Sequence, residues 1–291
     1  MRIAYLLALV TAVTLAACDF SKSAKVDFTT GLSSKGDGLR CSDVYLSIGK
    51  DEKTTRTTFV YGETFYVNFR NVSGFKKEGG NAFPGMEITV VGEQGDTALY
   101  YEDLYADKVN GVDVAPLFLY TNITVAKPMN SGKKYKLYVN IWDKKGKGTF
   151  KTKMDFDIVP NEHIKVEKSE KLSYNDIYLF SREEKSITDN QIKFNQTYYM
   201  IFEGLDGFAT ENGKMNVGLR MKATTADGEV LLNEADLLGD GEYDPALVNE
   251  QISANFIFKD ATIKTPVDCE FVVFDKKSDA TVSAKISLEV K

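Results

Sequence analysis

The sequence contains little histidine, tryptophan, proline or cysteine: its 291 residues include one His, one Trp, six Pro and three Cys. The single imidazole, on His163, excludes metal sites that are built from several histidines. Six prolines and 22 glycines are too few for a low-complexity linker protein. With 43% hydrophobic and 27% charged residues, the composition is that of a globular protein rather than a disordered chain.

Basic charge is also in short supply. Lysine and arginine together number 36 against 42 aspartates and glutamates, which gives a formal net charge of -6 at pH 7. Nucleic-acid binding depends on a basic face that neutralises phosphates, so we expect no nucleic-acid partner.

Recognisable catalytic motifs are missing as well. No G-x-S-x-G nucleophile elbow occurs in the sequence. Residues 131–134 match S-x-x-K, but they lie in a glycine-containing turn rather than at the start of a helix. We therefore expect that the protein is not an enzyme. A hydrolase that uses paired carboxylates remains an alternative, because carboxylates are too numerous for a pair to be excluded by counting.

One long hydrophobic run is present, at the N-terminus. Residues 1–17 carry a single charge, on Arg2, followed by an uncharged apolar stretch. This is the pattern of a secretory signal peptide, and the stretch is too short to span a bilayer comfortably. It ends in Leu15-Ala16-Ala17-Cys18, which resembles the lipobox of bacterial lipoproteins. The resemblance implies that a lipid is attached to Cys18, which becomes the first residue of the mature protein.

A lipid on Cys18 would hold the protein at a membrane. Each buried CH₂ group contributes about 0.8 kcal/mol, so several acyl chains on one cysteine anchor a soluble domain. Residues 18–25 are short and mostly polar, which predicts a flexible tether. Asp19 resembles the inner-membrane retention signal of enteric lipoproteins, a rule that does not hold in every phylum. We expect a cell-envelope protein that faces the periplasm or the cell surface, with the outer membrane favoured over the inner.

The other two cysteines could pair, because the expected compartment permits disulfides. Cys269, however, alternates with Val267, Phe271 and Val273, which is the pattern of one buried side of a strand. We therefore expect Cys269 to be a small buried apolar residue rather than a partner of Cys41.

An internal repeat is the most informative feature of the sequence. A shift of 133 residues aligns Asp43-Val44-Tyr45-Leu46 with Asp176-Ile177-Tyr178-Leu179, and residues 64–69 with 197–202. After one deletion in the second copy, Trp142-Asp143-Lys144-Lys145 aligns with Phe274-Asp275-Lys276-Lys277. The sequence therefore predicts a tandem duplication.

Each copy predicts a β-sandwich. Hydrophobic and polar residues alternate along 65–70 and 135–142, which is the period of a half-buried strand. Short helices are expected only at 100–105 and 233–238. The predicted fold class is all-β, with two tandem duplicated immunoglobulin-like or Greek-key β-sandwich domains after a lipoprotein signal peptide. The predicted segments are a signal peptide at 1–17, a lipidated tether at 18–25, domains at 26–159 and 164–291, and a linker at 160–163.

Acidic residues gather after the second expected helix. Oxygen ligands in a flexible loop suit calcium, so these residues form a possible calcium site. Their spacing does not match an EF-hand, and a solvated acidic loop is the alternative. The candidate ligands are Asp236, Asp240, Glu242 and Asp244.

Aromatic residues are the other candidates for binding. Tyr66, Tyr138 and Trp142 lie at outward-facing positions of expected strands, where exposed rings can stack on sugars or anchor a protein interface.

Two loops, at 108–116 and 241–248, differ between the copies and are expected to carry recognition. Tyr105 and Tyr243 are the candidate aromatic anchors beside these loops, and Trp142 completes the predicted set of binding residues.

A lipobox followed by tandem β-sandwiches resembles the cell-envelope lipoproteins of the Bacteroidota. The resemblance implies a membrane-anchored, non-catalytic module for protein interaction or structural support, with another envelope protein as its partner. A glycan-binding lipoprotein of a polysaccharide-uptake system is the alternative. Such proteins usually display several tryptophans, whereas this sequence has one.

Overall fold

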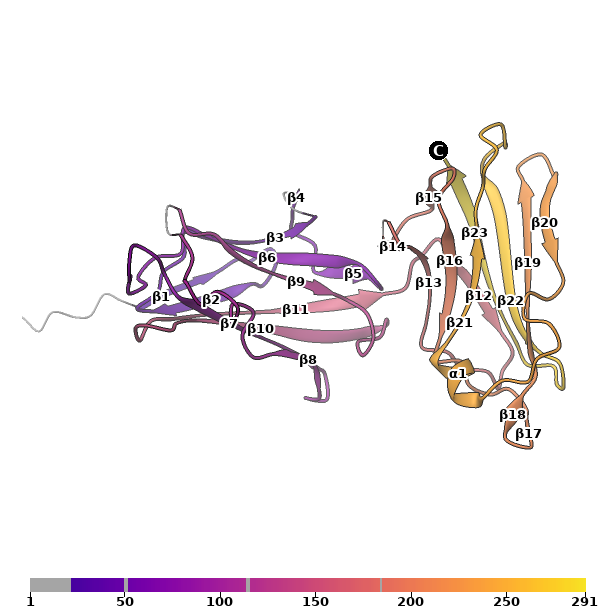
Figure 1. Ribbon diagram of the computed structural model, residues 1–291, viewed down its shortest axis with the longest axis horizontal. Coiled ribbons are helices and arrows are strands. Elements are labelled where there is room, and N and C mark those ends of the chain that lie inside the picture. Colours follow the sequence, from indigo (N-terminus) through magenta and orange to yellow (C-terminus); the bar gives the residue numbers. More distant parts are fainter. Residues whose placement is uncertain (1–21, 50–51, 114–115, 184) are drawn as a thin grey trace, which may run out of the picture.

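The structure is a computed structural model that describes residues 22–49, 52–113, 116–183 and 185–291. The predicted signal peptide and Cys18 lie outside these residues. Within them the chain consists of strands and one short helix, so the predicted all-β sandwich fold is confirmed. Figure 1 shows two bodies side by side, with the strands of the first running across the view and those of the second running upright.

The first body packs a larger sheet on a smaller one. The larger sheet has the order β1 (Lys22–Val26), β2 (Ser33–Asp37), β11 (Thr149–Val159), β10 (Lys133–Asp143), β7 (Pro84–Gly92), β8 (Thr97–Tyr101), and β5 (Thr58–Val60) pairs with β11. The smaller sheet has the order β4 (Glu52–Thr54), β3 (Asp43–Ile48), β6 (Thr64–Arg70), β9 (Leu119–Thr124).

The second body repeats this strand order. Its larger sheet has the order β12 (Lys165–Lys168), β23 (Thr281–Val290), β22 (Val267–Asp275), β19 (Val217–Thr225), β20 (Val230–Glu234), and β15 (Gln191–Ile192) pairs with β23. Its smaller sheet has the order β14 (Lys185–Ile187), β13 (Asp176–Ser181), β16 (Tyr198–Glu203), β21 (Gln251–Phe256). A hairpin of β17 (Thr210–Glu211) and β18 (Lys214–Met215) and the helix α1 (Pro245–Glu250) are additional.

The strand registers also agree between the two bodies. Asp43 faces Arg70 across β3 and β6, and Asp176 faces Glu203 across β13 and β16. Every other pair in these two ladders keeps the shift of 133 residues that the sequence alignment uses. Common descent of the two halves stays a prediction, but their strand order and pairing are the same.

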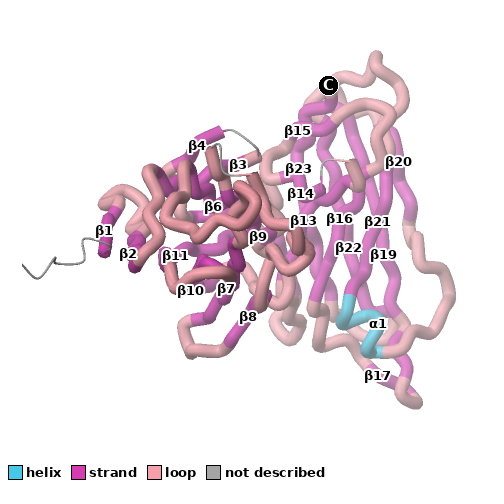
Figure 2. Tube along the Cα trace, turned by 60° about the vertical axis from the view of Figure 1, so that its left-hand side comes forward, coloured by secondary structure: helices cyan, strands magenta, loops and turns pink. Residues whose placement is uncertain are grey.

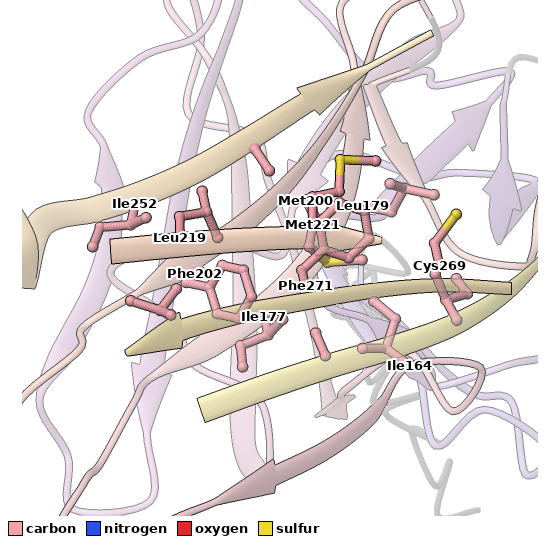
Figure 3. Close-up of a cluster of buried hydrophobic side chains, with 14 of the residues drawn as sticks. Ile164, Ile177, Leu179, Met200, Phe202, Leu219, Met221, Ile252, Cys269 and Phe271 are labelled. Atoms are coloured by element: carbon pink, nitrogen blue, oxygen red, sulfur yellow. The ribbon is translucent and has the colours of Figure 1, made fainter. Parts of the chain in front are cut away.

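Alternation along the strands builds a separate hydrophobic core in each body. Phe65, Val67 and Phe69 are fully buried, because every second residue of β6 faces the opposite sheet. Figure 3 shows the second core, where Phe202 and Phe271 meet between the sheets. Cys269 lies in this core with 2% of its surface exposed, and both described cysteines are free. The interpretation of Cys269 as a buried strand residue is therefore confirmed.

The two expected helices are wrong. Residues 97–101 and 230–234 are the strands β8 and β20, which pair with β7 and β19. A six-residue helix is too short to be stable without tertiary support, whereas an edge strand gains a complete hydrogen-bonded ladder. The helix that does form, α1, begins after Asp244, whose side chain accepts a hydrogen bond from Ala246 N.

Two connecting segments are more ordered than the sequence predicted. Residues 22–25, expected in the tether, belong to β1, which extends the larger sheet by pairing with β2. In the predicted linker at 160–163, Asn161 is buried and its Nδ2 donates to the carbonyls of Ile187 and Asp189. Backbone donors and acceptors that pair with a neighbouring element order these segments, a signal that hydrophobic periodicity does not contain.

Candidate binding surface

The four predicted calcium ligands are placed apart from one another in function. Asp236 Oδ1 accepts from Leu219 N and Leu238 N, and its Oδ2 pairs with Lys276. Burial acts to raise the pKa of Asp236, but the hydrogen bonds from these partners outweigh it, so the pKa lies below the ordinary value. Asp236 is thus occupied in holding the loop after β20.

The other acidic residues have separate contacts. Asp240 lies 3.7 Å from Lys276 Nζ, and Asp244 caps α1. Glu242 is exposed. Within the described ranges, no group of three or more His, Cys, Asp or Glu side chains is close enough to hold a metal ion. Calcium binding stays a prediction from the sequence.

The first body explains why these aspartates recur. Asp103 Oδ1 accepts from Met86 N and Tyr105 N, and its Oδ2 pairs with Lys144 at 2.7 Å. These are the partners of Asp236 at the same sequence shift. The repeated acidic residue is therefore a fastener between a loop and the larger sheet.

The hydroxyl groups of the predicted aromatic anchors bond to backbone. Tyr105 Oη accepts from Tyr120 N at 3.2 Å and donates to Tyr120 O at 3.4 Å, which covers the edge strand β9. Tyr243 Oη donates to the carbonyl of Leu238 at 2.7 Å. Both rings are half-buried against their cores.

Trp142 also has a structural contact. It faces Gly85 across β10 and β7, and a Cβ atom placed on Gly85 would lie 2.1 Å from the indole. Phe274 covers Gly218 in the same way in the second body. The aromatic ring fills the space that the glycine leaves on the outer face of the sheet.

Four other aromatic side chains form an exposed surface on the first body. We call them the aromatic face: Tyr45, Tyr66, Phe118 and Tyr120, on or beside β3, β6 and β9. Phe118 is 45% exposed and Tyr120 is 51% exposed. Their ring centroids lie 6.1 Å apart with planes 28° from parallel, and the ring of Tyr66 lies 6.3 Å from that of Tyr120. These are ordinary aromatic-pair separations, so the rings form one continuous apolar surface.

Positive charge borders this surface. Lys53 Nζ lies 4.1 Å from the ring centroid of Tyr45, and the Arg70 guanidinium carbon lies 5.2 Å from it. Arg70 Nε also donates to Tyr45 Oη at 3.1 Å. Arg70 is exposed, and Lys53 pairs with Asp43 at 3.0 Å. The aromatic face thus combines rings with cations, the side chains that dominate protein interfaces.

The corresponding face of the second body is covered by the end of the first, where Figure 2 also shows the two in contact. Tyr61 Oη donates to Glu203 Oε2 at 2.7 Å, and Tyr178 Oη donates to Glu203 Oε1 at 2.8 Å. The rings of the two tyrosines lie 5.2 Å apart. Burial, and then the hydrogen bond to Glu203, raise the pKa of both tyrosines, which keeps the hydroxyls protonated as donors.

A second contact completes this covered face. Asp176 is 1% exposed, and its Oδ2 accepts from Ser131 N of the first body at 3.2 Å. Burial is the main cause that raises the pKa of Asp176 to about 6, and Glu203 adds to it. Ser186 Oγ donates to the carbonyl of Tyr61 at 3.1 Å, so backbone and side chains both join the two bodies.

Sequence reasoning identified only Tyr66 among the aromatic face. Alternation along β9 could have identified Tyr120 and Phe118, because Leu117 and Leu119 between them are buried. The covered face could not be found in this way, because which face of a sheet meets another body depends on contacts far apart in the sequence.

Comparisons with known proteins give no family. No protein-family model matches the chain, and no curated protein matches it. Among solved structures, pT26-6p is similar at 10% identity over 93% of this chain, with a TM-score of 0.30, and the match spans 65% of that protein. A Bacteroides fragilis protein assigned as a β-galactosidase is similar at 10% identity, with a TM-score of 0.24 over 86% of this chain and 41% of that one. Similarity at this level carries no functional argument.

Membrane-spanning helices were also sought. Across the described segments, no helix has both the length and the apolar character that a bilayer crossing requires.

Proposed function

We propose that this chain is a non-catalytic, lipid-anchored envelope protein that binds another protein through the aromatic face of its first body. The observation that supports the proposal is the contrast between two equivalent surfaces. One small-sheet face is covered by another folded body, whereas its counterpart displays Phe118 and Tyr120 at about half exposure. An apolar surface bordered by cations fits a protein partner that carries acidic groups.

The test compares two tyrosines with similar exposure. Tyr120→Ala removes a ring from the aromatic face, and Tyr138→Ala removes one from the outer face of the larger sheet, where Tyr138 is 41% exposed. We expect Tyr120→Ala to weaken partner binding about tenfold or more, as at interface hot spots, and Tyr138→Ala to leave it unchanged. The measurement is capture of partners from native membranes by the full chain, followed by affinity measurement. Equal capture by wild type and Tyr120→Ala would contradict the proposal.

Glycan binding is the second candidate, because the exposed rings of Phe118 and Tyr120 lie close to parallel and could stack on a sugar. The same pair of variants distinguishes the two functions. Binding of envelope polysaccharide that is lost in Tyr120→Ala, with no captured protein, would replace a protein partner by a glycan.

The membrane anchor is part of the same proposal. Cys18→Ala should move the protein from the membrane fraction to the soluble or secreted fraction, because the acyl chains supply the binding energy. Fractionation after a high-salt wash measures this. A Cys18→Ala variant that still sediments with membranes would rule out the lipid anchor.

A further inference from the structure

We propose that the partner on the aromatic face is a second copy of this chain, which presents the free end of its second body. This inference rests on the proposed binding role of the aromatic face and names its occupant. Within one chain, the end of the first body already covers the small-sheet face of the second. The same contact between copies would place the end of the second body on the small-sheet face of the first.

The two ends are built alike. Tyr61 N donates to Val159 O and Gly62 N to Val125 O at the end of the first body. At the end of the second body, Phe194 N donates to Lys291 O and Asn195 N to Phe258 O. Gly62 and Asn195 both have positive φ, at 87° and 62°. Asparagine tolerates this conformation better than most residues, so the turn keeps its shape without glycine.

The exposure of the two ends differs as the inference requires. Tyr61, covered by the second body, is 2% exposed. Phe194, which takes its place at the free end, is half-buried, and the neighbouring Asn195 is exposed. The free end thus offers an aromatic ring at the position where Tyr61 makes its contact.

The charges of the two faces are opposite. The covered face of the second body carries Asp176 and Glu203. The open face of the first body carries Arg70 in the register position of Glu203, and Lys53 projects from the neighbouring strand. The open face has therefore exchanged an acidic group for a basic one.

The ends show the matching exchange. The end of the first body carries Arg56 and Lys127, and Lys127 N donates to Tyr61 Oη at 2.9 Å. At the shift of 133 residues their counterparts at the free end are Asp189 and Asp260, both exposed. A basic end meets an acidic face within the chain, and an acidic end would meet a basic face between chains. Complementary charge of this kind selects the partner and its orientation.

The proposed contact joins different surfaces of the two copies. Such a head-to-tail contact does not close on itself, so it adds one copy after another rather than stopping at a dimer. On a membrane surface it would link anchored copies into rows.

A charge exchange between copies tests the proposal. We compare the full chain in mild detergent by sedimentation velocity with the single variants Arg70→Glu and Asp260→Arg, and with an equimolar mixture of the two. Each variant alone places like charges at the contact, whereas the mixture restores opposite charges at every contact. We expect the wild type and the mixture to form species beyond a dimer, and each single variant to require about tenfold or more higher concentration. Lys151→Glu, an exposed change on the larger sheet, is the matched control and should assemble like wild type.

The outcomes separate this inference from the proposed function. A wild type that stays monomeric or stops at a dimer, or a mixture that behaves like the single variants, overturns self-association. If Tyr120→Ala still loses an envelope partner in that case, the binding role of the aromatic face stands with a different occupant. If Tyr120→Ala loses nothing either, both proposals fail.

Discussion

Aspartate has two different uses in this chain, and the surroundings of each carboxyl decide between them. Asp103 and Asp236 accept backbone N–H groups and pair with a lysine, so their charged form is favoured. Asp176 is buried between the two bodies with one backbone donor, from Ser131, and no cation among its printed partners. Its neutral form is favoured, and the contact between the bodies is therefore sensitive to pH.

Replacement of Asp176 by asparagine should stabilise the protein at neutral pH. The carboxyl has a pKa of about 6 in the folded chain against 3.8 in the absence of structure, so the folded state binds more protons between these values. The free energy of unfolding contributed by this group is therefore highest below about pH 4 and falls as the pH rises through 6. Asp176→Asn keeps an oxygen for Ser131 N and removes the charge, for a gain of at most about 3 kcal/mol at pH 7.5.

Thermal unfolding between pH 4 and 7.5 measures this effect. Asp176→Asn should show a higher Tm than wild type at pH 7.5 and a smaller change with pH. Asp155→Asn, on an exposed carboxylate of β11, is the control and should follow wild type. An Asp176→Asn variant that is less stable than wild type at pH 7.5 would mean that the charged carboxylate supports the contact.

At the scale of elements, alternation in the sequence predicts the long strands well. The buried positions of β6, β10 and β11 follow the predicted period, because each strand has one face on a core. The repeat also predicts the strand pairing, because the ladders of the two bodies keep the same register. Short elements are the failures: β1, β8 and β20 gain their structure from pairing with a neighbour, and their own residues carry no strong period.

The predicted binding residues show a similar division. Outward parity correctly indicates that Tyr66 and Trp142 lie off the core, but it does not indicate what covers them. Trp142 packs on Gly85, and Tyr66 lies beside Tyr120. The difference depends on cross-strand neighbours, which the sequence does not place beside each other. The aromatic face is therefore visible only after the strands are paired.

At the scale of the whole molecule, the two bodies use one surface in two ways. The small-sheet face of the second body receives the end of the first through Glu203 and Asp176. The same face of the first body carries Arg70 and an exposed aromatic cluster. A duplicated fold with one face filled and its counterpart open has a repeating contact already built into each chain, which is the basis for the proposed binding role.

The most direct test of this account is whether the aromatic face is covered where the protein works. Hydroxyl-radical footprinting of the full chain, in intact membranes and as dilute purified protein, reports side-chain exposure in both settings. We predict that Phe118 and Tyr120, each about half exposed in the isolated chain, are oxidised several-fold more slowly in membranes. Tyr138, on the other sheet, should react at the same rate in both and serves as the internal reference. Equal oxidation of Phe118 and Tyr120 in the two settings would show that nothing binds the aromatic face, and would contradict the account.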